Sequence, residues 1–167
     1  MLRDIVVDTN VFVHASNPRV TYYSEAKHLV SALEGSPTSL CVDEGFDVEP
    51  ARNRSLICGE YYTHLKFGMP AYALVSELAT SGRISIVPRC VDPAIGKKIN
   101  QNIVEPRDRT FLKVAINSQD CFLCSHDFRH FSDHKRTKVK KLFNVRVKTA
   151  GETLLFLAQN GRSALDR

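Results

Sequence analysis

Four acidic residues, far apart in the sequence, occupy positions from which a fold could bring their carboxylates together. Asp8 and Asp127 each follow a short apolar run that is typical of a buried strand. Asp108 stands where a helix N-cap belongs, and Glu60 is the only acid of the predicted helix at 56–65. Hard divalent cations such as Mg²⁺ and Mn²⁺ prefer oxygen ligands and relieve the repulsion between gathered carboxylates. The four acids therefore predict a metal site, although each alone could be a cap or a turn former.

Strands and helices are predicted to alternate along the chain. Apolar and β-branched runs predict strands at 5–7, 39–42, 84–87, 121–124 and 145–147, the last at an edge. Apolar residues at helical spacing predict helices at 22–34, 56–65, 70–81, within 89–107, after Asp108 and from Thr149. The polar segment 46–55 contains Pro50 and has no period, so we expect a loop there.

This alternation is typical of an α/β fold. Right-handed crossovers then build a mostly parallel central sheet of about five strands, flanked by helices on both faces. We expect one domain over residues 1–167. Ligands of such sheets bind beyond the carboxyl ends of the strands, where Asp8 and Asp127 are expected.

The composition excludes several protein classes. Hydrophobic residues make up 43% of the 167 residues and charged residues 25%, which is typical of a globular protein rather than a disordered or fibrous one. No apolar run approaches the roughly 18 residues that a membrane span requires. The first residues lack a secretory signal pattern, and five cysteines are an odd number for a disulfide framework. We therefore expect reduced thiols and a cytoplasmic location.

Positive charge is concentrated in the second half of the chain. Residues 89–167 carry 16 Lys/Arg against 8 Asp/Glu, whereas residues 1–88 carry 7 against 10. The densest stretch, from Lys135 to Lys148, contains no acid and indicates either a polyanion-binding surface or a solvated loop. If it binds nucleic acid, the residues that would contact backbone phosphates are Arg107, Arg109, Lys135, Arg136, Lys138, Lys140 and Lys141.

Several segments of the chain resemble the motifs of one nuclease family. Residues 5–12 (IVVDTNVF) look like its opening strand with the first acid, and residues 108–115 (DRTFLKVA) like its third-acid helix. Residues 122–131 (FLCSHDFRHF) look like the strand that carries its last acid, and residues 149–155 (TAGETLL) like its closing helix. In this order and spacing, the chain resembles a PIN-domain nuclease over roughly residues 4–158.

The resemblance implies a three-layer domain with Mg²⁺- or Mn²⁺-dependent endoribonuclease activity. Such an enzyme hydrolyses phosphodiester bonds of single-stranded RNA and leaves a 5′-phosphate and a 3′-hydroxyl. By the same resemblance, the catalytic metal ligands would be Asp8, Glu60, Asp108 and Asp127, with Thr9, Asn10 and Ser125 orienting the carboxylates or the phosphate. The resemblance also allows the chain to be the toxin of a toxin–antitoxin pair, with an antitoxin protein and a second copy of the chain as partners.

The second acid has two candidate positions. In the family it lies on a helix after the second strand, which favours Glu60. Asp43 and Glu44, however, already lie at the end of the predicted second strand, before the inserted segment 46–55. Both positions could contribute, whereas Asp120 precedes its strand and is expected to be structural.

Other combinations of residues suggest different chemistry. His126, His130 and His134 recur at the spacing of metal ligands on a helix, but we expect surface groups near the phosphate path. The His126-Asp127 pair also occurs in HD phosphohydrolases, which are all-helical.

A cysteine pair and three other functions are further alternatives. Cys121 and Cys124 would point to opposite faces of a strand, so we expect core thiols rather than a metal site. Asp8-Thr9-Asn10 could also open an aspartate phosphatase or a receiver domain. A catalytically silent PIN-like module that binds RNA or a protein is the remaining alternative.

Overall fold

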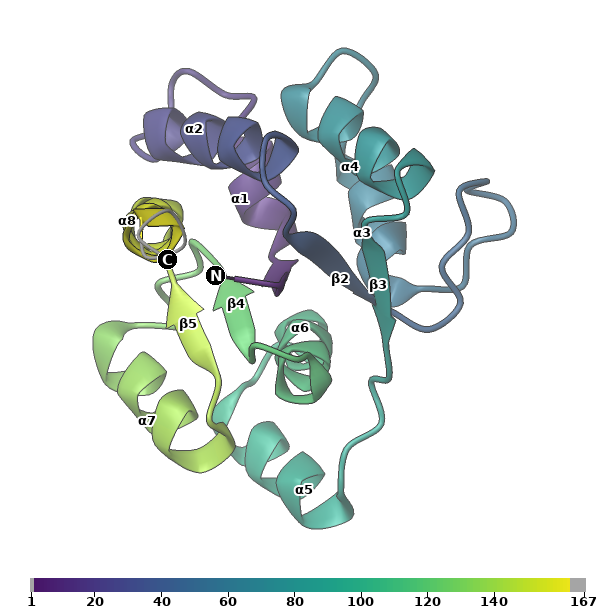
Figure 1. Cartoon of the computed structure of the whole chain (residues 1–167). Coiled ribbons are helices and arrows are strands. Elements are labelled where there is room, and N and C mark those ends of the chain that lie inside the picture. The colour runs from purple at the N-terminus through teal and green to yellow at the C-terminus, as the bar shows by residue number, and fades with distance from the viewer. Residues whose placement is uncertain (1, 163–167) are drawn as a thin grey trace.

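The computed structural model describes residues 2–162, in which five short strands form one parallel sheet with the order β3-β2-β1-β4-β5 (Figure 1). The strands are β1 (Asp4–Val7), β2 (Ser39–Asp43), β3 (Ile84–Val87), β4 (Phe122–Cys124) and β5 (Arg146–Lys148). β1 is central and pairs with β2 and β4, so the carboxyl ends of β1 and β4 are adjacent. Edge strand β5 is at the position expected from its alternating pattern.

Eight helices in the described residues cover the two faces of the sheet. α1 (Thr9–His14), α2 (Tyr23–Glu34), α4 (Pro70–Thr80) and α8 (Ala150–Arg162) lie on one side of it, and α5 (Pro93–Asn102), α6 (Pro106–Asn117) and α7 (Asp133–Phe143) lie on the other (Figure 1). α3 (Leu56–His64) packs against both α1 and α6. The predicted α/β class is confirmed, and the layers are consistent with a three-layer PIN-like arrangement.

The apolar core explains why the central strands are so uniformly hydrophobic. Val6 and Val7 on β1 and Leu123 on β4 are completely buried, because helices cover both faces of the sheet. Phe12 of α1 and Tyr61 of α3 contact each other edge to face, with ring centroids 5.2 Å apart. This contact fixes α1, which follows Asp8, against α3, which carries Glu60.

Three local predictions differ from the structure. Asp8 is followed by helix α1, which the sequence analysis did not predict, and the Asp8 carboxylate caps that helix. The N-cap of α6 is Glu105, so Asp108 lies in the first helical turn because Pro106 starts the helix. The basic stretch is mostly helix α7 rather than a loop, since the lysines and arginines are good helix formers.

Two predictions from composition can be compared with the described residues. Between residues 2 and 162, no helix combines the length and the apolar character needed to cross a membrane. All five cysteines are free thiols. Cys124 is fully buried in the core, as expected, whereas Cys121 is half-buried in a left-handed backbone conformation just before β4.

A candidate metal centre at the carboxyl ends of the central strands

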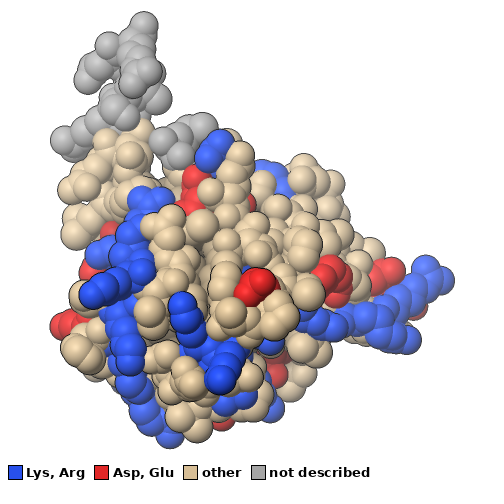
Figure 2. Space-filling view, turned by 90° about the horizontal axis from the view of Figure 1, so that it is seen from below, with Lys and Arg blue, Asp and Glu red and all other residues tan. Residues whose placement is uncertain are grey.

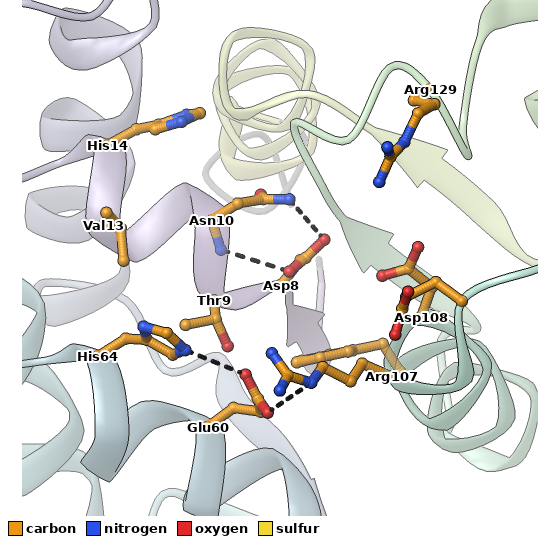
Figure 3. Close-up of a pocket in the computed structure, with 12 residues that line it drawn as sticks. Asp8, Thr9, Asn10, Val13, His14, Glu60, His64, Arg107, Asp108 and Arg129 are labelled. Carbon is orange, nitrogen blue, oxygen red and sulfur yellow. Dashed lines mark hydrogen bonds and ion pairs between the residues drawn. The ribbon is translucent and has the colours of Figure 1, made fainter.

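A cavity of about 580 Å³ opens beside the carboxyl ends of β1 and β4 (Figure 3). Three of the predicted acids line it: Asp8 after β1, Glu60 from α3 and Asp108 from α6. The fourth, Asp127, does not line this cavity, but it is joined to Asp8 and Asp108 through two shared side chains. The fold therefore brings together acids that are separated by up to 119 positions in the sequence.

Asp8 is buried and accepts several hydrogen bonds. Its Oδ2 accepts 2.7 Å bonds from the Ser125 hydroxyl and the Asn10 amide, and its Oδ1 accepts from the Asn10 backbone N–H. Burial raises the pKa of Asp8 to about 6, with repulsion from Asp108 and Asp127 adding to the rise and the Ser125 bond opposing it. Ionisation of Asp8 in the folded protein therefore costs free energy, and a nearby cation would reduce this cost.

Ser125 links the two strand-end aspartates. Its hydroxyl donates to Asp8 Oδ2 and accepts the backbone N–H of Asp127 at 3.0 Å. Burial raises the pKa of Asp127, but bonds from the backbone N–H and the ring of His130 outweigh it, so this pKa lies below its ordinary value. Asp127 is thus the readily ionised member of the pair.

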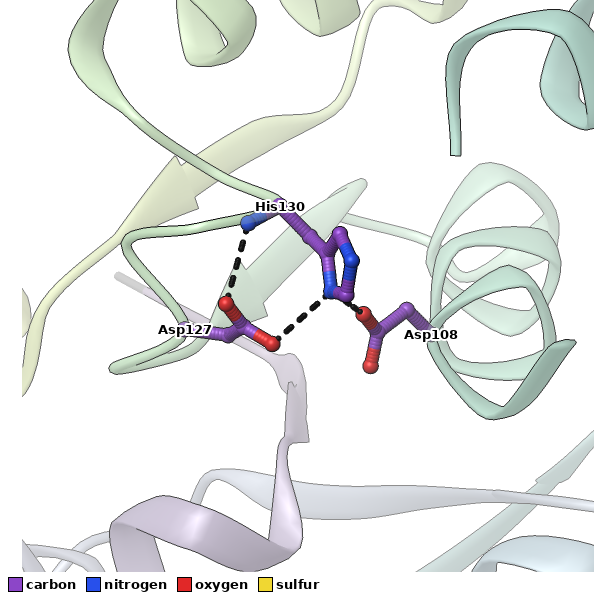
Figure 4. Close-up of side chains that lie close together, drawn as sticks. All are labelled: Asp108, Asp127 and His130. Atoms are coloured by element: carbon purple, nitrogen blue, oxygen red, sulfur yellow. Dashed lines mark hydrogen bonds and ion pairs between the residues drawn. The ribbon is translucent and has the colours of Figure 1, made fainter. Parts of the chain in front are cut away.

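His130 lies between Asp108 and Asp127 (Figure 4). Its Nδ1 is 2.5 Å from Asp108 Oδ2 and 3.0 Å from Asp127 Oδ2, and one ligand atom from each of the three residues lies within 4.8 Å of the others. Asp108 Oδ2 is buried and makes no aligned hydrogen bond within the described residues. Burial, followed by repulsion from Asp127, raises the pKa of Asp108. Two carboxylates and one imidazole could hold one divalent ion here.

Glu60 lies on the other rim of the cavity. Its carboxylate pairs with Arg107 at 3.2 Å and with His64 at 3.4 Å (Figure 3). Neither Asp43 nor Glu44 lines the cavity. The structure therefore brings Glu60, rather than the other two candidates, to the face that also carries Asp8.

Asp43 and Asp120 instead have structural environments. Asp43 is fully buried, pairs with Arg89 at 2.7 Å and accepts bonds from the start of α3. Glu44 accepts the Arg89 backbone N–H. Asp120 accepts the backbone N–H of Arg3 and forms an ion pair with its guanidinium, as expected of a structural residue.

The smaller polar residues lie around Asp8. Thr9 is buried, lines the cavity, and its hydroxyl finds no hydrogen-bond partner among the residues described. Asn10 donates to Asp8 and accepts the backbone N–H of His126, so it ties the start of α1 to the end of β4. An unpartnered hydroxyl beside Asp8 leaves one further oxygen available to a ligand in the cavity.

The predicted phosphate-binding residues have different surroundings. Arg107 lines the cavity. The Arg109 guanidinium donates to the carbonyl groups of Ile103 and Val104. The Arg136 guanidinium donates to the Phe131 carbonyl and to the Glu152 carboxylate. The ammonium of Lys135 donates to the Arg129 carbonyl and that of Lys140 to Asn144, and Lys138 and Lys141 are exposed. Seen from the side of α5 and α7, Lys and Arg side chains form a broad band (Figure 2).

The histidine prediction was partly wrong. His134 is exposed on α7 as expected, but His126 and His130 are both buried. The His130 position three residues after Asp127 is the sequence signal that could have identified it as a candidate ligand. Arg129, the other cation that points into the cavity, is likewise identifiable only through its neighbour Asp127 (Figure 3).

The HD phosphohydrolase alternative does not fit this structure, because the His126-Asp127 pair follows a strand of a parallel sheet. Instead, His126 Nε2 accepts the backbone N–H of Ala150, and its Nδ1 lies 2.9 Å from His14 Nδ1. Burial, followed by the neighbouring His14, lowers the pKa of His126 to about 4. No family model matches the chain, and no curated protein matches it significantly.

Proposed function

We propose that the chain is a divalent-metal-dependent endoribonuclease of the PIN type. The observation that carries this proposal is the convergence of Asp8, Asp108 and Asp127 at the carboxyl ends of β1 and β4. Two shared contacts support this convergence: the Ser125 hydroxyl bonds to Asp8 Oδ2 and to the backbone N–H of Asp127, and His130 Nδ1 lies within 3.0 Å of both Asp108 Oδ2 and Asp127 Oδ2. The motif resemblance supports the family, and the basic band of α7 supports an anionic polymer as substrate.

The residues fit Mg²⁺ or Mn²⁺ as the cofactor. Asp108 Oδ2 is buried without an aligned hydrogen bond, and the surrounding donors are mainly carboxylate oxygens, which hard divalent ions prefer. The imidazole of His130 makes the donor set more suitable for Mn²⁺ than for Mg²⁺. When bound, such an ion supplies Lewis-acid chemistry that activates water and neutralises charge on a phosphate.

The protein side chains would divide the remaining work. Asp108 and Asp127 would hold the ion, and the 2.7 Å hydrogen bond from Ser125 fixes the orientation of the Asp8 carboxylate. Arg107 and Arg129, which line the cavity from opposite sides, orient the phosphodiester by their positive charge (Figure 3). Glu60 holds Arg107 in place by their ion pair and remains close enough to the cavity to accept a second ion.

Cleavage of end-labelled single-stranded RNA in Mn²⁺ tests this function. The wild type should cleave it, and Asp8→Asn, which removes a ligand charge while retaining size, should reduce the rate at least a hundredfold. Glu34→Gln is the matched control, because this exposed acid ends α2, precedes the amino end of β2 and does not line the cavity. RNA binding without cleavage in the wild type would contradict the proposal and support the silent binding module instead.

A further inference from the structure

Four aromatic rings form a cluster beside the candidate metal centre. We call His14, Tyr22, His126 and Phe128 the ring cluster. The His14 and His126 rings are 5.2 Å apart and nearly parallel at 19°, and the His126 and Phe128 rings are parallel within 8°. Tyr22 lies 4.9 Å from His126 and 5.0 Å from Phe128, which joins the rings into one group. The cluster brings α1, the segment before α2 and the segment after β4 together.

The outermost ring of the cluster is open to solvent. Phe128 is 38% exposed, although its neighbour His126 is buried. The guanidinium of Arg136 lies 5.4 Å from the centre of the Phe128 ring, a cation–π contact that fixes the ring with a positive charge beside it. Contacts with Tyr22 and Arg136 fix the phenyl ring in place, so its exposed part can receive another flat aromatic group at little cost in side-chain entropy.

The ring cluster is continuous with the cavity. His14 belongs to both, and Phe128 stands in the chain between Asp127, a candidate metal ligand, and Arg129, which points into the cavity (Figure 3). A polymer whose phosphate lies between Arg129 and Asp108 would therefore place its next unit near Phe128. Arg129, which lines the cavity, directly follows Phe128 in the chain, so a cation for a phosphate and a ring for an aromatic group lie in neighbouring residues.

We propose that Phe128, supported by Tyr22, is a stacking site for an unpaired nucleobase adjacent to the phosphate that is cleaved. The position of that phosphate rests on the proposed function, but the stacking itself does not require cleavage. A base within a duplex has both faces covered by its neighbours, so this site selects nucleic acid that is single-stranded at that nucleotide. Selection acts on the flat face of the base, and we therefore expect little sequence preference.

Fluorescence of 2-aminopurine, placed at each position in turn of a short uridine-rich RNA, tests this site directly. Binding to the full-length Asp8→Asn protein should quench the probe at one position by stacking. Phe128→Ala should abolish the quenching and weaken RNA binding about tenfold, because the stacking of one base is lost. Phe128→Trp should restore both, and Phe67→Ala, at a 93% exposed ring on the turn between α3 and α4, should change neither.

An abasic RNA provides a second measurement that does not depend on the variant. Removing the base at the quenched position should weaken RNA binding by the protein that retains Phe128 by the same factor. RNA binding by the Phe128→Ala variant should not change when the base is removed. Unquenched probes at every position, or equal affinity of both proteins for intact RNA, would overturn the stacking site. Quenching without any cleavage by the wild type would leave the stacking site standing and reject the nuclease alone.

Discussion

Two aspartates that share the Ser125 bridge have opposite electrostatic environments. Burial raises the pKa of Asp8 to about 6, whereas the hydrogen bonds from His130 hold the pKa of Asp127 below its ordinary value despite partial burial. A carboxyl group whose pKa is higher in the folded than in the unfolded chain destabilises the fold when it is ionised. Asp8 and Asp127 therefore contribute to folding with opposite signs at neutral pH.

Substitution by asparagine should show these opposite signs in the metal-free protein. Because Asp8 shifts from 3.8 to about 6, stability is lost as pH rises through this window, and Asp8→Asn should raise the free energy of unfolding at pH 8 by roughly 1–3 kcal/mol. That gain should vanish below pH 4. Asp127→Asn should lower stability at pH 8, an effect that fades as pH falls through the lowered pKa. Urea denaturation at several pH values measures both, and a destabilised Asp8→Asn at pH 8 would refute this electrostatic assignment.

His130 contacts both Asp108 and Asp127 and should therefore govern metal affinity. We expect His130→Asn to weaken Mn²⁺ binding roughly tenfold, because groups that hold or orient ligands typically contribute 10- to 100-fold. Mg²⁺ binding should weaken less, since imidazole suits Mn²⁺ better. Calorimetric titration of each ion gives the comparison, with His134→Asn on the exposed face of α7 as the control. Equal losses for both ions would show that His130 is no nitrogen ligand.

At the level of elements, helix starts position the cavity residues. Asp8 caps α1, and the carboxylate of Asp43 accepts the hydroxyl of Ser55 and the backbone N–H groups of Leu56 and Ile57 at the start of α3. Asp43 also pairs with Arg89, so it ties β2 to α3 and to the segment after β3. The helix that carries Glu60 is thus anchored by an acid that does not itself line the cavity.

Asp43→Ala should therefore destabilise the protein without acting on the cavity directly. Removing a fully buried carboxylate that pairs with Arg89 and accepts three hydrogen bonds at the start of α3 should lower the free energy of unfolding by about 3 kcal/mol. Glu44→Ala, at the neighbouring exposed acid, should change it by less than about 0.5 kcal/mol. Thermal and urea unfolding would detect the difference, and equal stability of the two variants would contradict the capping role.

Much of this arrangement was predictable from the sequence. The strands and most helices follow from apolar periodicity, and strand ends in a parallel sheet place Asp8 and Asp127 at one edge without further information. Helix α1 was not predictable in this way, because Asp8-Thr9-Asn10 resembles both a strand end and a helix cap. The position of His130 three residues after Asp127 could have suggested a ligand, but its contact with Asp108 was not predictable, because Asp108 approaches from another element.

Across the whole molecule, charge is divided between the acidic cavity and the basic band. The cavity is lined by four acids, Asp8, Glu60, Glu105 and Asp108, and by two arginines, whereas the face around α5 and α7 carries many lysines and arginines (Figure 2). This division allows a polyanion to be attracted by one surface while a cation is held at the other. The balance of charges favours binding that is strong at low salt and weak in sequence preference.

The exposed lysines of α7 should determine part of the salt dependence. For single-stranded RNA, each phosphate contact contributes about 0.7 to the slope of log affinity against log salt concentration. Lys138→Gln with Lys141→Gln removes two such contacts and should therefore reduce that slope by about 1.4, without altering the cleavage rate at saturating RNA. Lys66→Gln, at an exposed lysine just after α3, is the control. An unchanged slope in the double variant would exclude α7 from the RNA path.

Anomalous diffraction from a crystal soaked in Mn²⁺ measures most directly whether the gathered acids hold an ion. We expect a manganese peak within bonding distance of the Asp108 and Asp127 carboxylates, with the His130 imidazole as a further ligand. At a Mn²⁺ concentration that supports cleavage, the absence of a peak there, with the His130 ring still between the two carboxylates, would contradict the proposed metal centre.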